Sequence, residues 1–113
     1  MSEQNPFGGS IVHLTPAEVN QGLADGTILL VDVREPNEIQ AERIPGAEVL
    51  PLSRFDPFAL PDPQGKRLVF SCRSGQRSQQ AAAVAQKVGL PYEEHMKGGI
   101  LAWKAAGYEV ERG

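Results

Sequence analysis

The chain has 113 residues, a hydrophobic fraction of 41% and one cysteine, so it suits a single domain with an ordinary core and excludes an internal disulfide. Its net charge of −3 is scattered along the sequence, which argues against nucleic-acid binding. No apolar run approaches the ~20 residues of a membrane span, and the polar N-terminus carries no secretory signal, so we expect a cytoplasmic protein without a membrane partner.

The N-terminal part predicts an arm, a short strand and a helix. Residues 1–10 are polar and glycine-rich, and we expect a flexible arm. An apolar stretch at 11–13 predicts an edge strand. Thr15 is a candidate N-cap, and Glu18 completes a capping box with it. The helix that begins there is expected to end at Gly26.

The middle of the chain predicts two buried strands. Residues 28–33 form a continuous apolar run, which is typical of a parallel strand covered on both faces. A short polar helix is expected over 35–42 and a short strand over 48–50. Prolines in 51–66 exclude a long regular element there, although one helical turn is compatible with them. Residues 67–71 predict the second buried strand.

The C-terminal part alternates helices and strands. A glycine-containing loop is expected over 72–78, followed by an alanine-rich helix over 79–88. A strand is predicted at 92–95, a helix at 100–106 and a final edge strand at 108–110.

This alternation predicts an α/β fold for residues 11–113. We expect a central, mainly parallel five-stranded sheet with helices on both faces. No internal repeat or low-complexity tract interrupts the pattern.

The segment around the single cysteine carries the chemistry. Cys72 follows a predicted strand, at the edge where open parallel sheets bind ligands. The residues between it and the next predicted helix are Arg73, Ser74, Gly75, Gln76, Arg77 and Ser78. Unpaired loop amides and the positive end of a helix dipole stabilise an anion, so a thiolate at Cys72 is expected to be a nucleophile. A buried, inert cysteine is the alternative, and the polar, basic surroundings disfavour it.

Three stretches of the sequence resemble the rhodanese family. Residues 30–38 with 44–47 resemble its N-terminal signature, 72–78 its active-site loop and 97–103 its C-terminal signature. The three occur in order, and the likeness extends over about residues 10–111. The resemblance implies a rhodanese-like fold.

The resemblance also implies sulfur transfer through a persulfide on Cys72. Thiosulfate or a persulfide donor would supply the sulfur, and cyanide, a small thiol or a protein would accept it. Residues 73–78 would form the substrate- and anion-binding loop, with Arg73 and Arg77 attracting the donor's negative charge. No cofactor is implied, and no metal site is expected, because His13 and His95 do not lie at ligand spacing from the cysteine.

Other functions remain open from the sequence. The same loop suits a persulfide relay between proteins, and some rhodanese-like domains are thought to act only as interaction modules. A cysteine phosphatase or arsenate reductase is a further alternative. Such phosphatases use Cys-x5-Arg, whereas Cys72 to Arg77 spans six residues and is one residue shorter, which favours sulfur over the larger phosphoryl group.

Several other conspicuous residues are interpreted as structural. Asp32 and Arg34 are expected to form a charged pair near the site that pins the turn after a strand. His13 and His95 are interpreted as ordinary surface or strand-end residues and not as bases. Trp103 is expected to pack in the core.

Overall fold

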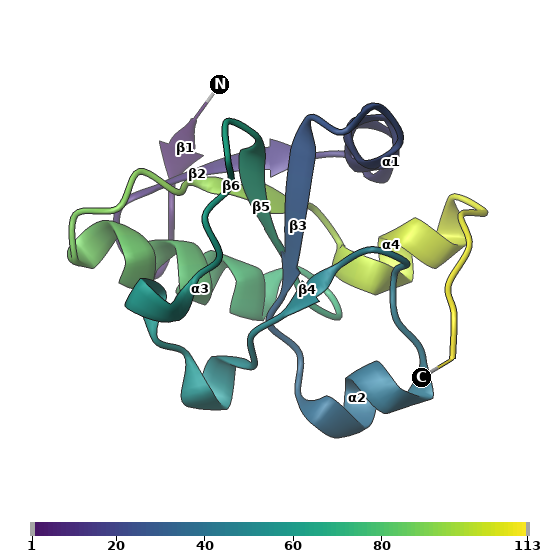
Figure 1. Ribbon diagram of the computed structural model, residues 1–113. Coiled ribbons are helices and arrows are strands. Elements are labelled where there is room, and N and C mark those ends of the chain that lie inside the picture. The colour runs from purple at the N-terminus through teal and green to yellow at the C-terminus, as the bar shows by residue number, and fades with distance from the viewer. Residues whose placement is uncertain (1, 113) are drawn as a thin grey trace.

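The computed structural model describes residues 2–112 and contains one mixed sheet with helices on both faces (Figure 1). The strands are β1 (Glu3–Gln4), β2 (Ser10–Leu14), β3 (Ile28–Asp32), β4 (Glu48–Val49), β5 (Arg67–Ser71) and β6 (Glu94–Met96). The helices are α1 (Pro16–Asp25), α2 (Pro36–Ala41), α3 (Gln76–Lys87) and α4 (Gly99–Ala105), with two 3₁₀ turns at Leu52–Arg54 and Pro57–Ala59.

The strand order is β1-β2-β6-β5-β3-β4, and every pairing except β1 with β2 is parallel. The expected α/β fold with a mainly parallel sheet is confirmed. Five of the six predicted strands are present and pair in parallel. Because β1 adds an antiparallel strand at the edge, the sheet has six strands and not the expected five. Strand β1 lies within residues 1–10, where Asn5 is also buried and donates a hydrogen bond to the carbonyl of Gln79.

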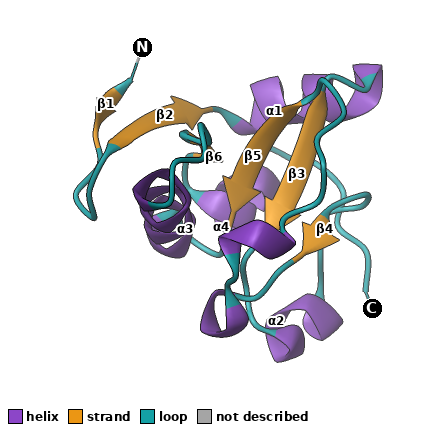
Figure 2. Ribbon diagram, turned by 60° about the vertical axis from the view of Figure 1, so that its left-hand side comes forward, coloured by secondary structure: helices purple, strands orange, loops and turns teal. Residues whose placement is uncertain are grey.

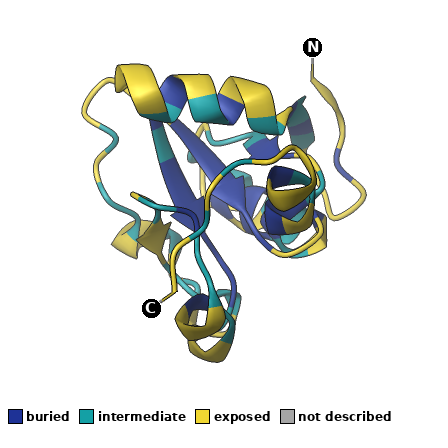
Figure 3. Cartoon of the chain, turned by 90° about the vertical axis from the view of Figure 1, so that its right-hand side faces the viewer, coloured by how far each residue is buried: buried dark blue, intermediate teal, exposed yellow. Residues whose placement is uncertain are grey.

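Helices lie on both sides of the sheet (Figure 2), and an apolar cluster fills the space on each face. On one face, Phe70 and Cys72 pack with three alanines of α3. On the other face, Leu30 and Val69 pack with residues of α1 and α4, among them Trp103. The central strands are consequently dark blue in Figure 3, while the outer sides of the helices are exposed. Burial of β3 and β5 on both faces explains their uninterrupted apolar runs.

Local signals account for α1. Thr15 accepts a hydrogen bond from the amide of Glu18, whose carboxylate accepts one from the amide of Thr15, so the predicted capping box is confirmed. Gly26 ends the helix in the left-handed conformation, with φ of 77°.

Two segments differ most from the sequence-based expectation, while other element ends shift by one or two residues. Helix α3 begins at Gln76 and not at residue 79, because Gly75 adopts φ of 104° and turns the chain directly into the helix. The strand expected at 108–110 does not form. Instead Glu111 makes an isolated bridge with Arg43, while Tyr108 and Val110 pack against the layer that contains Trp103.

Candidate active site

The candidate nucleophile lies where β5 meets α3. Cys72 follows the last residue of the strand and is 1% exposed. The amide of Gly75 donates a hydrogen bond to its Sγ over 3.0 Å, and α3 starts at the next residue. The sulfur therefore faces an amide N–H at the positive end of a twelve-residue helix, which is a site that stabilises a thiolate.

Helix α4 holds the loop from the other side. The amide of Ile100 donates to the carbonyl of Cys72 over 2.9 Å, and that of Leu101 donates to the carbonyl of Arg73 over 3.2 Å. A Cβ at Gly99 would lie 2.3 Å from the Cys72 carbonyl oxygen. Only glycine permits this approach, which turns the loop carbonyls toward α4 and away from the sulfur.

The residues of the predicted loop divide between loop and helix. Arg73 and Ser74 are exposed and Gly75 is buried, all three within the loop. Gln76, Arg77 and Ser78 form the first turn of α3 instead, with Gln76 exposed and Ser78 buried.

The two arginines of this segment have different surroundings. Arg77 donates to both carboxylate oxygens of Glu38 in α2, over 2.6 and 2.8 Å. These hydrogen bonds lower the pKa of Glu38 to about 2 and raise that of Arg77. Within residues 2–112, Arg73 has no ion-pair partner. Arg73 therefore has the uncommitted positive charge beside Cys72, whereas Arg77 links α3 to α2.

Asp32 and Arg34 form an ion pair at the carboxyl end of β3. They are 1% and 3% exposed, and Arg34 binds both carboxylate oxygens. The guanidinium also donates to the backbone carbonyl of Glu42, over 2.9 Å. The hydrogen bonds of this pair thus fix the connection through α2.

The sequence did not predict that the two histidines lie in a hydrogen-bonded chain next to the cysteine. His95 is 1% exposed, and its Nδ1 lies 2.7 Å from Ser78 Oγ. Its Nε2 lies 2.7 Å from Nδ1 of His13, and Ser78 Oγ is 3.5 Å from Cys72 Sγ. Burial, together with the charge of His13, lowers the pKa of His95 to about 4. The interpretation of His95 as an ordinary surface residue is therefore wrong. His95 is buried, and hydrogen bonds through Ser78 connect it to the cysteine.

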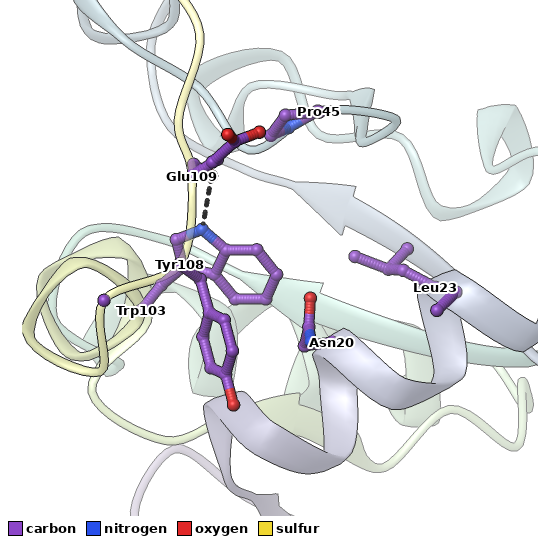
Figure 4. A pocket seen from close by; sticks show the side chains of 8 residues that line it. Asn20, Leu23, Pro45, Trp103, Tyr108 and Glu109 are labelled. Atoms are coloured by element: carbon purple, nitrogen blue, oxygen red, sulfur yellow. Dashed lines mark hydrogen bonds between the residues drawn. The ribbon is translucent and has the colours of Figure 1, made fainter.

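A hollow of about 410 Å³ lies elsewhere, between α1 and the C-terminal segment (Figure 4). Trp103 and Tyr108 line it, and the indole of Trp103 donates to the carbonyl of Glu109 over 2.7 Å. Trp103 is 3% exposed, which confirms its predicted place in the core. Cys72 does not line this hollow. The candidate site is therefore identified by the surroundings of the thiol and not by the presence of a pocket.

Over residues 2–112, no helix is both long and apolar enough to cross a membrane. The same residues contain no group of three or more histidine, cysteine or acidic side chains placed to hold a metal ion.

A mainly parallel α/β sheet that presents a cysteine to a short loop and a helix N-terminus defines the class of fold and site that this chain has. Within that class the chain belongs to the rhodanese family: the model of the Rhodanese-like domain matches residues 15–106.

Individual relatives and one solved structure are similar to this chain over most of its length. An uncharacterized protein of Synechocystis sp. is 42% identical over 85% of this chain and 54% of its own length. The thiosulfate sulfurtransferase GlpE of Pseudoalteromonas translucida is 33% identical over 88% of this chain and 96% of its own. A solved structure from Rhodopseudomonas palustris, of unknown function and described as a possible tyrosine phosphatase, aligns with a TM-score of 0.75 and 35% identity, covering 89% and 85% of the two chains. The chain spans only 24–54% of the length of the first curated relatives it matches.

Proposed function

We propose that the chain is a sulfurtransferase in which Cys72 carries sulfane sulfur. The thiolate of Cys72 attacks the outer sulfur of thiosulfate, the S–S bond of the donor breaks, and sulfite leaves with the bonding electrons. The product is a Cys72 persulfide anion. Cyanide or a thiolate then attacks the outer sulfur, and the Cys72 thiolate leaves, ready for another cycle.

The observation that carries the proposal is the position of Cys72 Sγ, 3.0 Å from the amide nitrogen of Gly75 at the start of α3. An amide and a helix N-terminus favour the thiolate before attack and the persulfide anion after it. No general base is needed for attack by a thiolate that has already formed. The exposed Arg73 supports the choice of an anionic donor, because its charge has no partner within residues 2–112.

The length of the loop supports sulfur over phosphate. Cys72 and Arg77 are separated by four residues, one fewer than in a Cys-x5-Arg phosphatase loop. Arg77 is in addition held by Glu38 in two hydrogen bonds and is not directed at an incoming phosphoryl group. We therefore favour thiosulfate or another sulfane donor as the substrate. A reducing cytoplasm is the compartment that suits this free thiol.

The test is release of thiocyanate from thiosulfate and cyanide by the purified protein. We expect turnover by the wild type and none by Cys72→Ser, which keeps the size of the side chain and loses the nucleophile. Hydrolysis of an aryl phosphate, measured in parallel, is expected to be absent. A wild-type protein that cleaves the aryl phosphate and releases no thiocyanate would overturn the proposal.

A persulfide relay is the second candidate. Several relatives are much longer than this chain, so related domains occur joined to other parts. In a relay, a protein persulfide would load Cys72 and a biosynthetic partner would remove the sulfur. A slow reaction with thiosulfate combined with fast loading by a protein persulfide would favour the relay over an enzyme for small donors.

A further inference from the structure

His95 is a buried titratable group that the sulfur-transfer steps do not use. We propose that His95, held by His13, orients the hydroxyl of Ser78 toward Cys72, and that the three side chains carry the thiol proton from Cys72 to the surface. Ser78 and His95 are then positioning residues for the thiolate. The proton route concerns formation of the Cys72 thiolate. It rests on the proposed function only in that sulfur transfer is the reaction that would use this thiolate.

The geometry is a continuous chain of side chains from four elements and the end of β5. Cys72 Sγ is 3.5 Å from Ser78 Oγ, which is 2.7 Å from Nδ1 of His95. Nε2 of His95 is 2.7 Å from Nδ1 of His13, whose Nε2 lies 3.6 Å from a carboxylate oxygen of Glu3. His13 and His95 are register partners in the parallel pair of β2 and β6, so the sheet itself sets their contact.

Burial changes along this chain from one end to the other. Cys72 and His95 are each 1% exposed and Ser78 is fully buried. The side chain of His13 is 26% exposed, and that of Glu3 is 68% exposed. A proton that leaves a buried thiol needs a route to water, and these side chains lead stepwise from the sulfur to solvent.

Each ionisation state of Cys72 leaves the chain fully hydrogen-bonded. With the thiol present, S–H donates to Ser78 Oγ, Ser78 O–H donates to His95 Nδ1, and His95 Nε2–H donates to His13 Nδ1. When the proton leaves, each donor passes its hydrogen outward, and Nε2 of His13 releases one proton to water. Ser78 O–H then donates to the thiolate, and His95 Nδ1–H donates to Ser78. The chain ends with one proton fewer, and that proton has entered the water, so the transfer balances.

Burial, together with the charge of His13, keeps His95 neutral, as a member of such a chain must be. Its pKa is lowered to about 4, so near neutral pH one ring nitrogen accepts while the other donates. On β6 itself, Glu94 is paired with Arg67, so its charge is already matched. Arg77 of α3 is committed to Glu38. The groups that face the ring are thus Ser78 and His13, with Glu3 one step further out on β1.

The test is the pH profile of Cys72 alkylation by iodoacetamide, read by intact mass. This reagent reports the thiolate without any sulfur donor. We expect Ser78→Ala to slow alkylation at least tenfold at pH 7 and to move the midpoint of the profile upward by about one pH unit, since one pH unit corresponds to a tenfold change in thiolate fraction. His95→Phe is expected to do the same, and Ser78→Thr, which restores a hydroxyl, to recover most of the rate.

Ser71→Ala is the matched control. Ser71 precedes Cys72 and is fully buried, and its hydroxyl has no hydrogen-bond partner among the described residues. The same substitution there is expected to leave the profile unchanged. If folded Ser78→Ala protein gives the same profile as Ser71→Ala, the inference is overturned, even if His95→Phe fails to fold.

The surface end of the chain offers a second measurement. His13→Ala removes the partner of His95 at a partly exposed position, and we expect a threefold or greater loss of alkylation rate that imidazole in the buffer restores. A loss that imidazole does not restore would contradict the proposed role of His13. A normal alkylation profile without sulfur transfer would instead refute the proposed function and leave the inference standing.

Discussion

Two neighbouring strands end at the same edge of the sheet, and their ends are used differently. β3 ends in Asp32, whose charge is neutralised by Arg34, with both side chains almost completely buried. β5 leads into Cys72, whose sulfur receives a hydrogen bond from Gly75 but none from a charged side chain of residues 2–112. The polar groups at the end of β3 are fully hydrogen-bonded within the chain, whereas the end of β5 holds the candidate nucleophile, whose hydrogen-bond partners are weak.

Asp32 is a structural polar group, whereas Cys72 is the candidate nucleophile. Burial alone does not distinguish them, because Asp32 and Cys72 are each 1% exposed. The difference is in the partners. Arg34 donates six hydrogen bonds, four to the Asp32 carboxylate and two to backbone carbonyls, whereas the Cys72 thiol meets an amide and a hydroxyl. We therefore expect the free energy of unfolding to depend on the Asp32–Arg34 pair at the end of β3, and the reactivity of the thiol to depend on the partners of Cys72 at the end of β5.

Asp32→Ala tests the structural end and has the largest expected effect on stability. It leaves the buried Arg34 without its counter-charge, and removing one partner of a buried pair costs about 3–5 kcal/mol. Urea denaturation measures the loss. Asp62→Ala, at an exposed loop position, is the control and should change the free energy of unfolding by about 0.5 kcal/mol or less. A loss below about 1 kcal/mol for Asp32→Ala would contradict the structural role.

Gly99→Ala tests the packing of α4 against the cysteine loop. The new Cβ would meet the carbonyl oxygens of Cys72 and Arg73 at 2.3 and 2.4 Å, at a residue with φ of +60°. We expect about 2 kcal/mol of destabilisation, together with slower alkylation of Cys72. Gly107→Ala is the matched variant, because Gly107 also has positive φ (+87°) but nothing lies within 4 Å of its added Cβ. Equal effects of the two substitutions on alkylation would refute the importance of this close approach.

Glu38→Gln tests the ion pair that links α2 to α3, and its effect is the smallest. The pKa of Glu38 is lowered from 4.5 to about 2 in the folded protein, so the stabilisation is complete above pH 4.5 and is lost as the pH falls toward 2. Because both side chains are partly exposed, we expect about 1 kcal/mol. Thermal unfolding between pH 2 and 7 should show a weaker pH dependence in Glu38→Gln than in the wild type. An unchanged dependence would exclude this carboxylate as its source.

Local signals made much of the fold predictable. The boundaries of β5 match the apolar run 67–71, and Thr15, Glu18 and Gly26 define α1 through contacts within a few residues. The start of α3 was not predictable in the same way, because Gln76 and Arg77 carry no apolar periodicity and the decisive feature is the positive φ of Gly75. The segment 108–110 alternates like a strand, but its side chains pack on the core layer and the backbone stays outside the sheet.

The candidate site was also predictable only in part, because some of its contacts are local in the sequence and others depend on how the strands pair. Cys72 and its loop are contiguous in the sequence, so motif and chemistry together identify them. His13 and His95 are 82 residues apart, and their contact depends on β2 pairing with β6 in one register. No local pattern encodes that pairing. The only signal in the sequence is that each histidine is the last residue of a predicted strand, 11–13 for His13 and 92–95 for His95.

The most direct test of Cys72 as a sulfur carrier is the intact mass of the protein after incubation with thiosulfate and removal of excess reagent. We predict a gain of one sulfur atom in the wild type, reversed by cyanide and absent in Cys72→Ser. A wild-type mass that does not change, or an equal gain in Cys72→Ser, would contradict the account.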